Sequence, residues 1–386
     1  MNKALIIQNG LVIDPEALTI KEMDIGMING KFAPIGEVLN QEQSDIQYID
    51  AMGYYVSPGF IDLHAHIFKD YTELGIDADT VGVEQGVTTI VDAGSSGYDN
   101  YHLFKEEIIH TSKTEVLALL NISRKGLCHG LSELASLEEL MTLEEAREIF
   151  RKEKSIVGLK ARMSGSVVKN SGIQPLIHAR DLADQLHKPI MVHIGNPPPN
   201  LQEIFPLLMK GDIVTHAFHG KKHGVLNESG EMIPEAIDAL NRGVRFDVGH
   251  GTSSFSYQTM RRFRERYDDL VFTISTDIYK NNYTSPVGSL MVTMSKLLAL
   301  EYSLTEVVAA VTKRAADTLH LKEQGTLSYG TIADVTIFSL EETSSLLADS
   351  EGNELACHQI LTPYMTIKTG KVAYKREDGI ENDSTL

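Results

Sequence analysis

Residues 56–66 read VSPGFIDLHAH, an apolar run that ends in alternating polar residues. Strand side chains alternate with a period of two, so this stretch predicts a buried strand with His64 and His66 on one face. Seven further short runs, rich in Val and Ile as buried parallel strands are, lie at residues 87–94, 115–123, 155–163, 189–195, 212–218, 244–251 and 270–277.

Segments with apolar residues at helical spacing separate these runs, for example at residues 136–154 and 233–243. Eight strand-then-helix units over residues 56–320 predict an α/β fold, a (β/α)8 TIM barrel, whose usual length is about 250 residues. An open, doubly wound parallel sheet is the competing architecture at this point.

The two ends of the chain have a different residue pattern from the middle. Residues 1–55 and 321–386 contain short alternating apolar runs that are separated by Gly and Asn, a pattern typical of β-hairpins. We expect both ends to pair into one composite β domain beside the barrel.

Composition excludes several classes of function. The chain has 386 residues, of which 42% are hydrophobic, and a net charge of −18 disfavours nucleic acid and anionic membranes as partners. No apolar run reaches the roughly 18 to 20 residues of a membrane span, and the start MNKALIIQNG lacks the apolar region of a secretion signal, so we expect a cytoplasmic protein. Cys128 and Cys357 alone cannot build a thiolate zinc site.

Chemistry-bearing side chains gather where the predicted strands end. The carboxyl ends of barrel strands carry the active site in TIM-barrel enzymes. Imidazole and carboxylate are ligands that suit zinc or a similar divalent ion, although a lone His-x-His is as well explained by structural histidines. The residues concerned are His64, His66, Lys160, His193, His216 and Asp277.

These motifs together resemble the amidohydrolase superfamily of metal-dependent hydrolases, with the dihydroorotase-like and deacetylase branch as the nearest part. The resemblance rests on VSPGFIDLHAH (56–66), LKARM (159–163), VHIG (192–195), THAF (215–218), STD (275–277) and GTIADVTIF (330–338). It implies a small β-sandwich domain formed by both termini. It also implies that His64, His66 and Asp277 bind one of two divalent ions, which we expect to be zinc, that His193 and His216 bind the other, and that Lys160 bridges them.

Lys160 needs a chemical explanation, because an ammonium group has three donors and no acceptor and cannot bind a cation. In the family, a lysine at this place reacts with carbon dioxide to form a carbamate, which offers one oxygen to each metal. The alternative is an ordinary ion pair between Lys160 and an acidic residue at the barrel mouth.

The resemblance also suggests catalytic roles. A metal-bridging hydroxide would attack the substrate, and Asp277 is placed to act as general base and then general acid. Arg162, two residues after Lys160, faces the same side of its strand and is a candidate for catalysis and for binding a substrate carboxylate, or else for a salt bridge at the barrel mouth. His250 is a second candidate for substrate binding, whereas His129, His219 and His223 are expected to face solvent.

This chain departs from the residue patterns of two subfamilies, and these departures limit the range of expected reactions. Phe68 occupies the place where dihydroorotases usually carry a carboxylate-binding Arg. Nucleobase deaminases of the family commonly use one metal and a Glu on the fifth strand instead of a bridging lysine, whereas this chain has Lys160. We therefore expect an enzyme that removes a small acyl group, such as acetyl, from an N-acyl-amino acid or a 2-acyloxy acid. A cyclic amide hydrolase of dihydroorotase or hydantoinase type, a nucleobase deaminase and a non-catalytic barrel remain alternatives. The expected partners are a small acidic substrate and further copies of this chain.

Overall fold

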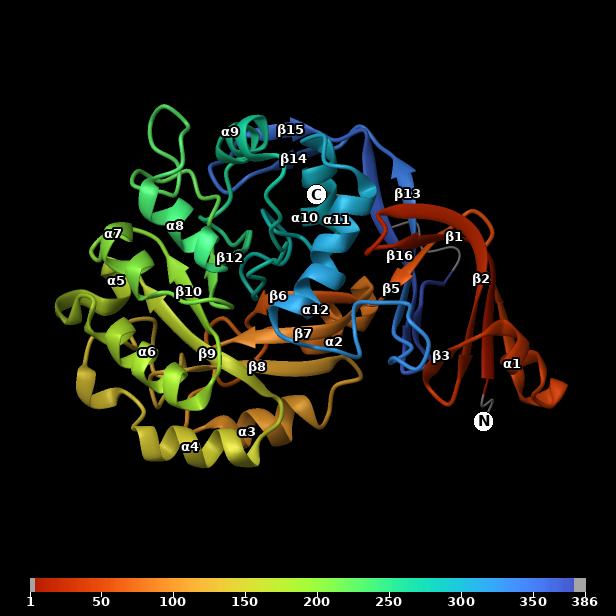
Figure 1. Ribbon diagram of the computed structural model, residues 1–386, viewed down its shortest axis with the longest axis horizontal. Helices are drawn as coiled ribbons and strands as arrows, with labels where there is room; N and C mark the ends of the chain where they lie inside the picture. The colour runs from red at the N-terminus through yellow and green to blue at the C-terminus, as the bar shows by residue number, and fades with distance from the viewer. Residues whose placement is uncertain (1–3, 378–386) are drawn as a thin grey trace.

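A closed barrel of parallel strands forms the centre of the molecule in the computed structural model, which describes residues 4–377. Seven strands are neighbours in chain order (Figure 1), namely β6 (Phe60–Ala65), β7 (Val87–Ala93), β8 (Glu115–Asn121), β9 (Ile156–Met163), β10 (Ile190–Ile194), β11 (Ile213–Thr215) and β12 (Arg245–Phe246). The predicted eighth strand closes the ring through two parallel bridges, Asp247 with Thr273 and Ala65 with Ile278. The barrel prediction is therefore confirmed, and the open sheet is excluded.

The last two barrel strands are less regular than the sequence predicted. Only residues 245 and 246 of the run at 244–251 form a regular strand. The run at 270–277 contributes one bridge, at Thr273, and the second bridge is at Ile278, directly after the run. Side chains replace part of the strand ladder here, because the Asp247 carboxylate accepts hydrogen bonds from Thr215, Thr273 and Ser275 at 2.6 to 2.7 Å.

Helices surround the barrel and connect its strands (Figure 1). The α-helices are α1 (Ile35–Leu39), α2 (Ala78–Val81), α3 (Tyr101–Phe104), α4 (Leu143–Lys152), α5 (Gly165–Val168), α6 (Gln174–Leu186), α7 (Leu201–Ile204), α8 (Pro234–Arg242), α9 (Tyr257–Tyr267), α10 (Leu290–Ala299), α11 (Leu304–Val311) and α12 (Lys313–Thr318). In residues 4–377, no helix combines the length and the apolar character that crossing a bilayer requires.

One predicted helix starts later than its apolar pattern suggests. Residues 137–139 form a separate 3-10 turn, and α4 begins only after Thr142. The Thr142 side chain accepts from the Glu145 amide while the Glu145 carboxylate accepts from the Thr142 amide, a capping box that fixes the start of the helix. The prediction for residues 233–243 agrees closely with α8.

Strands from the two ends of the chain share one eight-stranded sheet. Its strands are β1 (Ala4–Asp14), β2 (Thr19–Ile28), β3 (Lys31–Ala33), β4 (Ile46–Asp50), β5 (Tyr55–Pro58), β13 (Val335–Glu342), β16 (Gln359–Lys368) and β17 (Lys371–Lys375). β5 joins the two ends, because it pairs with β1 on one side and with β13 on the other. Figure 1 shows the red amino-terminal and blue carboxy-terminal strands side by side next to the barrel. A separate hairpin is formed by β14 (Leu346–Ala348) and β15 (Glu354–Ala356).

Candidate active site

The predicted metal ligands of β6 and the eighth strand meet at one end of the barrel. The Nε2 atoms of His64 and His66 each lie 3.2 Å from Asp277 Oδ1. One ligand atom from each of these three residues lies within 4.8 Å of the others, a grouping that could hold a metal ion. His216 Nε2 lies 3.9 Å from Asp277 Oδ2 and 2.8 Å from His193 Nδ1, so the second predicted pair lies directly beside the first group.

Two of these residues have strained backbone conformations. His216 and Asp277 have φ values of 64° and 50°, in the left-handed region that side chains other than Gly rarely adopt. Such strain costs on the order of 1–3 kcal/mol and is often found at functional sites. The rest of the fold holds both residues in place, for example through the Asp277 amide, which donates to the His64 carbonyl at 2.6 Å.

Protonation in the cluster suits a divalent cation. Burial holds the pKa of His64 and His193 well below the usual value and lowers the pKa of His216 to about 3, so these rings are neutral at pH 7. Burial by itself would raise the pKa of Asp277, but the hydrogen bond from His66 and the nearby His216 and Lys160 lower it overall. Neutral imidazole and ionised carboxylate are the forms that bind metal ions.

Hydrogen bonds on the remote ring nitrogens orient three of the histidines. Thr215 Oγ1 donates to Asp247 Oδ2 at 2.7 Å, so it accepts from His64 Nδ1 at 3.0 Å and leaves His64 Nε2 free to bind a cation. His66 Nδ1 contacts Ser95 Oγ at 3.0 Å. His216 Nδ1 donates to the Gly249 carbonyl at 2.6 Å. Partners of this kind fix the tautomer and the ring direction of metal-binding histidines.

Lys160 is fully buried and lies next to His64 of the cluster. Its Nζ atom lies 3.1 Å from His64 Nε2 and 3.3 Å from Met191 Sδ. Within residues 4–377, no carboxylate lies within ion-pair distance of this ammonium group, so the salt bridge that the sequence left open is not formed. Burial lowers the pKa of Lys160 to about 7, so far more of the amine is neutral at neutral pH than in an exposed lysine.

Glycines make room for the cluster in the loops that follow β7 and β12. A Cβ atom on Gly94 would lie 2.8 Å from Lys160 Cγ, and one on Gly251 would lie 2.4 Å from Asp277 Oδ2. Both glycines also have positive φ values, +85° and +51°, which favour Gly on their own. Neither glycine was predicted to belong to the site.

A cavity of about 230 Å³ opens onto the cluster, and its walls include His66, Arg162, His193, Lys221 and Asp277. Arg162 faces this cavity as the strand periodicity predicted. Its Nη1 atom also pairs with Glu133 Oε2 at 3.1 Å, and the Glu133 side chain is only 2% exposed. Glu133 and Lys221 were not predicted as site residues, because both lie in loops whose course no periodicity reveals.

His250 does not line this cavity. Its ring is buried, its Nδ1 atom lies 2.9 Å from the Gly251 carbonyl, and its Nε2 atom lies 2.8 Å from the buried Lys296 Nζ. The predicted contact between His250 and substrate stays a prediction, and the bonds observed here attach α10 to the loop that carries Gly251.

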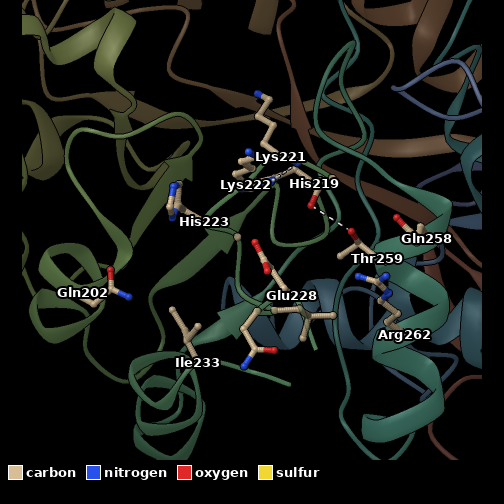
Figure 2. Close-up of a pocket in the computed structure, with 14 residues that line it drawn as sticks. Gln202, His219, Lys221, Lys222, His223, Glu228, Ile233, Gln258, Thr259 and Arg262 are labelled. Atoms are coloured by element: carbon tan, nitrogen blue, oxygen red, sulfur yellow. Dashed lines mark hydrogen bonds between the residues drawn. The ribbon is translucent and has the colours of Figure 1, made fainter. Parts of the chain in front are cut away.

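A second cavity, of about 360 Å³, lies beside the first and shares Lys221 with it (Figure 2). The expectation that His219 faces solvent was wrong, because this residue is 2% exposed. Its Nδ1 atom accepts from the Lys221 amide at 3.2 Å, and a bond from Thr259 Oγ1 to its carbonyl attaches the segment to α9. His223 and His129 are exposed as predicted.

Comparisons with known proteins agree with this geometry. The profile of a deacetylase-like composite domain matches residues 327–374. A deacetylase of Enterococcus faecalis is 36% identical over 96% of this chain and 99% of its own length. This chain belongs to the deacetylase branch of the amidohydrolase superfamily. A deacetylase of Agrobacterium fabrum, also 36% identical, covers 90% of this chain and 86% of its own length.

Two solved structures of similar chains have titles that name enzymes other than deacetylases. A crystal structure titled an adenine deaminase has 35% identity and a TM-score of 0.88 over 96% of this chain and 99% of its own. A crystal structure titled a dihydroorotase has 32% identity and a TM-score of 0.85 over 96% and 97%. The deacetylase-branch chain described here is therefore a hydrolytic enzyme on the superfamily's barrel fold.

Proposed function

We propose that this protein is a two-metal hydrolase that removes an acetyl or similarly small acyl group from an N-acyl-amino acid or a 2-acyloxy acid. The observation that carries the proposal is the group of His64, His66, His193, His216 and Asp277 around the buried Lys160. Deacetylase names among relatives that are 36% identical support the acyl group, and the cavity of about 230 Å³ suits a small substrate.

The chain's own residues fit two divalent ions, for which zinc is our expectation. His64, His66 and Asp277 would hold one ion, and His193 and His216 would hold the other. When bound, such ions lower the pKa of water from about 15.7 towards 7 and polarise a carbonyl group. A carbamate on Lys160 would link the two sites, and the pKa of about 7 supports it because carbon dioxide reacts with the neutral amine.

Asp277 would move the proton in the reaction. Its carboxylate is ionised at neutral pH and borders the cavity, so it can take a proton from the attacking water as the new carbon–oxygen bond forms. The same proton then goes to the leaving nitrogen or oxygen as its bond to the acyl carbon breaks. General acid–base catalysis of this kind contributes about 10²- to 10⁴-fold in rate.

Two properties of Phe68 and Lys160 support a deacetylase over the alternatives. Phe68 is fully buried and packs against Phe104 with 5.1 Å between ring centres, so it cannot take the place of a carboxylate-binding arginine. Lys160 Nζ lies 3.1 Å from His64 Nε2, a position that supports a two-metal hydrolase over a one-metal deaminase.

The test is acetate release by zinc-loaded protein from N-acetyl-D-amino acids, N-acetyl-L-amino acids and 2-acetoxy acids, with the Asp277→Asn variant as the blank. We expect release from at least one class, and a loss of about 10²- to 10⁴-fold in kcat in the variant with its fold intact. No release from any compound would overturn the deacetylase proposal, and the same protein would then be assayed on cyclic amides and on adenine.

A further inference from the structure

The active-site cavity contains two basic side chains whose charges are balanced differently. Arg162 is 14% exposed and Glu133 is 2% exposed, with 3.1 Å between Arg162 Nη1 and Glu133 Oε2. A second contact, from the same nitrogen to Glu133 Oε1, measures 3.4 Å. The charge of Arg162 is therefore already balanced inside the protein, and a substrate carboxylate would have to compete with Glu133 for it.

Lys221 lines the same cavity without such a partner. In the part of the chain that the structure describes, no carboxylate lies within 4.0 Å of its ammonium group. Burial lowers the pKa of Lys221, and Asp277 raises it, which places the ammonium group within the electric field of the active site. Among the described residues that line this cavity, Lys221 is thus a basic side chain without a carboxylate at ion-pair distance, in contrast to Arg162.

The local structure fixes the backbone at Lys221 close in sequence to the predicted metal ligand His216. His216 is five residues earlier, and the His219 ring between them is buried and accepts from the Lys221 amide at 3.2 Å. In Figure 2 the Lys221 side chain extends away from Ile233 and Arg262, which lie at the far side of the second cavity. Its neighbour Lys222 is exposed and lines only the second cavity.

We propose that Lys221 binds the carboxylate of the substrate and so gives the enzyme its preference for acids. The assignment rests on the proposed function. With the carboxylate at Lys221 and the acyl carbonyl at the histidine cluster, the scissile bond lies between the two, beside Asp277. Lysine suits this role because its ammonium is a point charge with three rotatable donors, which tolerates both amino-acid and hydroxy-acid skeletons. Arg162, which its ion pair with Glu133 holds in place, then forms part of the cavity wall.

The experiment compares Lys221→Met with Lys222→Met, which removes the adjacent charge outside the active-site cavity. Each protein is assayed for acetate release from an N-acetyl-amino acid and from its carboxamide, which lacks the negative charge. We expect Lys221→Met to lower kcat/KM for the acid by about 10- to 100-fold, the usual effect of losing one bond to a charged group, and to leave the carboxamide nearly unchanged. Lys222→Met should leave both unchanged, and Lys221→Arg should retain part of the preference for the acid.

Further arms separate the ways in which the assignment can fail. Arg162→Lys should lower the rates on acid and carboxamide alike, whereas a selective loss on the acid would move the carboxylate site to Arg162. An equal loss on both substrates in Lys221→Met would overturn the assignment of Lys221 and leave the proposed function intact. A wild-type protein that releases no acetate from either compound would overturn the proposed function and this assignment with it.

Discussion

The hydroxyl group of Thr215 contacts the ring of His64, one of the residues proposed to hold a cation. Thr215 links the Asp247 carboxylate to the His64 ring, because it donates to Asp247 and accepts from His64. Thr273 donates to the other oxygen of Asp247 at 2.7 Å, and the described structure gives it no hydrogen bond to a histidine of the cluster. We expect Thr215→Val to weaken metal binding by about 10- to 100-fold, because the His64 ring loses its orienting partner. Competition with a chelator measures this, and Thr273→Val is the matched control. Equal losses in the two variants would show that Asp247 acts on the fold and not on His64.

The proposed carbamate on Lys160 would provide an anionic oxygen where the sequence provides an amine. We expect Lys160→Ala to lose nearly all turnover, and added propionate to restore part of it by providing a carboxylate in the vacated space. The Asp277→Asn variant serves as control, since propionate cannot replace a proton-transferring group in another position. Turnover of Lys160→Ala close to that of the wild type would contradict a bridging role, as would a purified, metal-loaded protein whose mass lacks the carbamate.

The loops that follow the barrel strands have glycine where a side chain would displace the cluster. At Gly251, with φ +51°, a Cβ atom would lie 2.4 Å from Asp277 Oδ2, whereas Gly53, with φ +83°, has nothing within 4 Å of an added Cβ. We expect both Gly→Ala variants to lose about 1 kcal/mol of stability from the backbone conformation, and Gly251→Ala alone to lose most of its turnover. Thermal unfolding and acetate release measure the two effects. Similar turnover in both variants would mean that Asp277 tolerates the displacement.

The elements of this fold differ in how far the sequence can predict them. Short apolar runs rich in Val and Ile identified the barrel strands and put six chemistry-bearing side chains at their ends, because parallel strands that are buried on both faces are continuously apolar. The helix start at Thr142 depends on a capping box, and the short β12 depends on side chains from three strands that meet at Asp247. Glu133, Lys221 and Lys296 escaped notice because their roles arise from long-range contacts, which local patterns do not encode.

At the scale of the whole molecule, the predicted ligands connect strands that are far apart in the sequence. His64 belongs to β6 and His66 follows directly after it, Lys160 belongs to β9 and His193 to β10. Asp277 belongs to the closing segment, which bridges back to β6 at Ala65. A bound ion would therefore crosslink the barrel at its least regular part, where the closing segment joins the β12 side and β6 through the bridges Asp247–Thr273 and Ala65–Ile278. Metal and fold should consequently stabilise one another, since an ion that binds only the native state adds to the free energy of unfolding.

Removal of the metal tests this coupling. A chelator should abolish turnover and lower the melting temperature by about 3 °C, which is what the loss of roughly 2.7 kcal/mol, the stabilisation at 100 times Kd, means for a chain of this length. Zinc should restore both properties. The Asp277→Asn variant, which lacks one ligand, should show a smaller shift on chelation. If the wild type lost all metal and kept its melting temperature, the ions would not crosslink the barrel, and closure would rest on the Asp62 carboxylate, which accepts from the Thr276 amide at 3.1 Å.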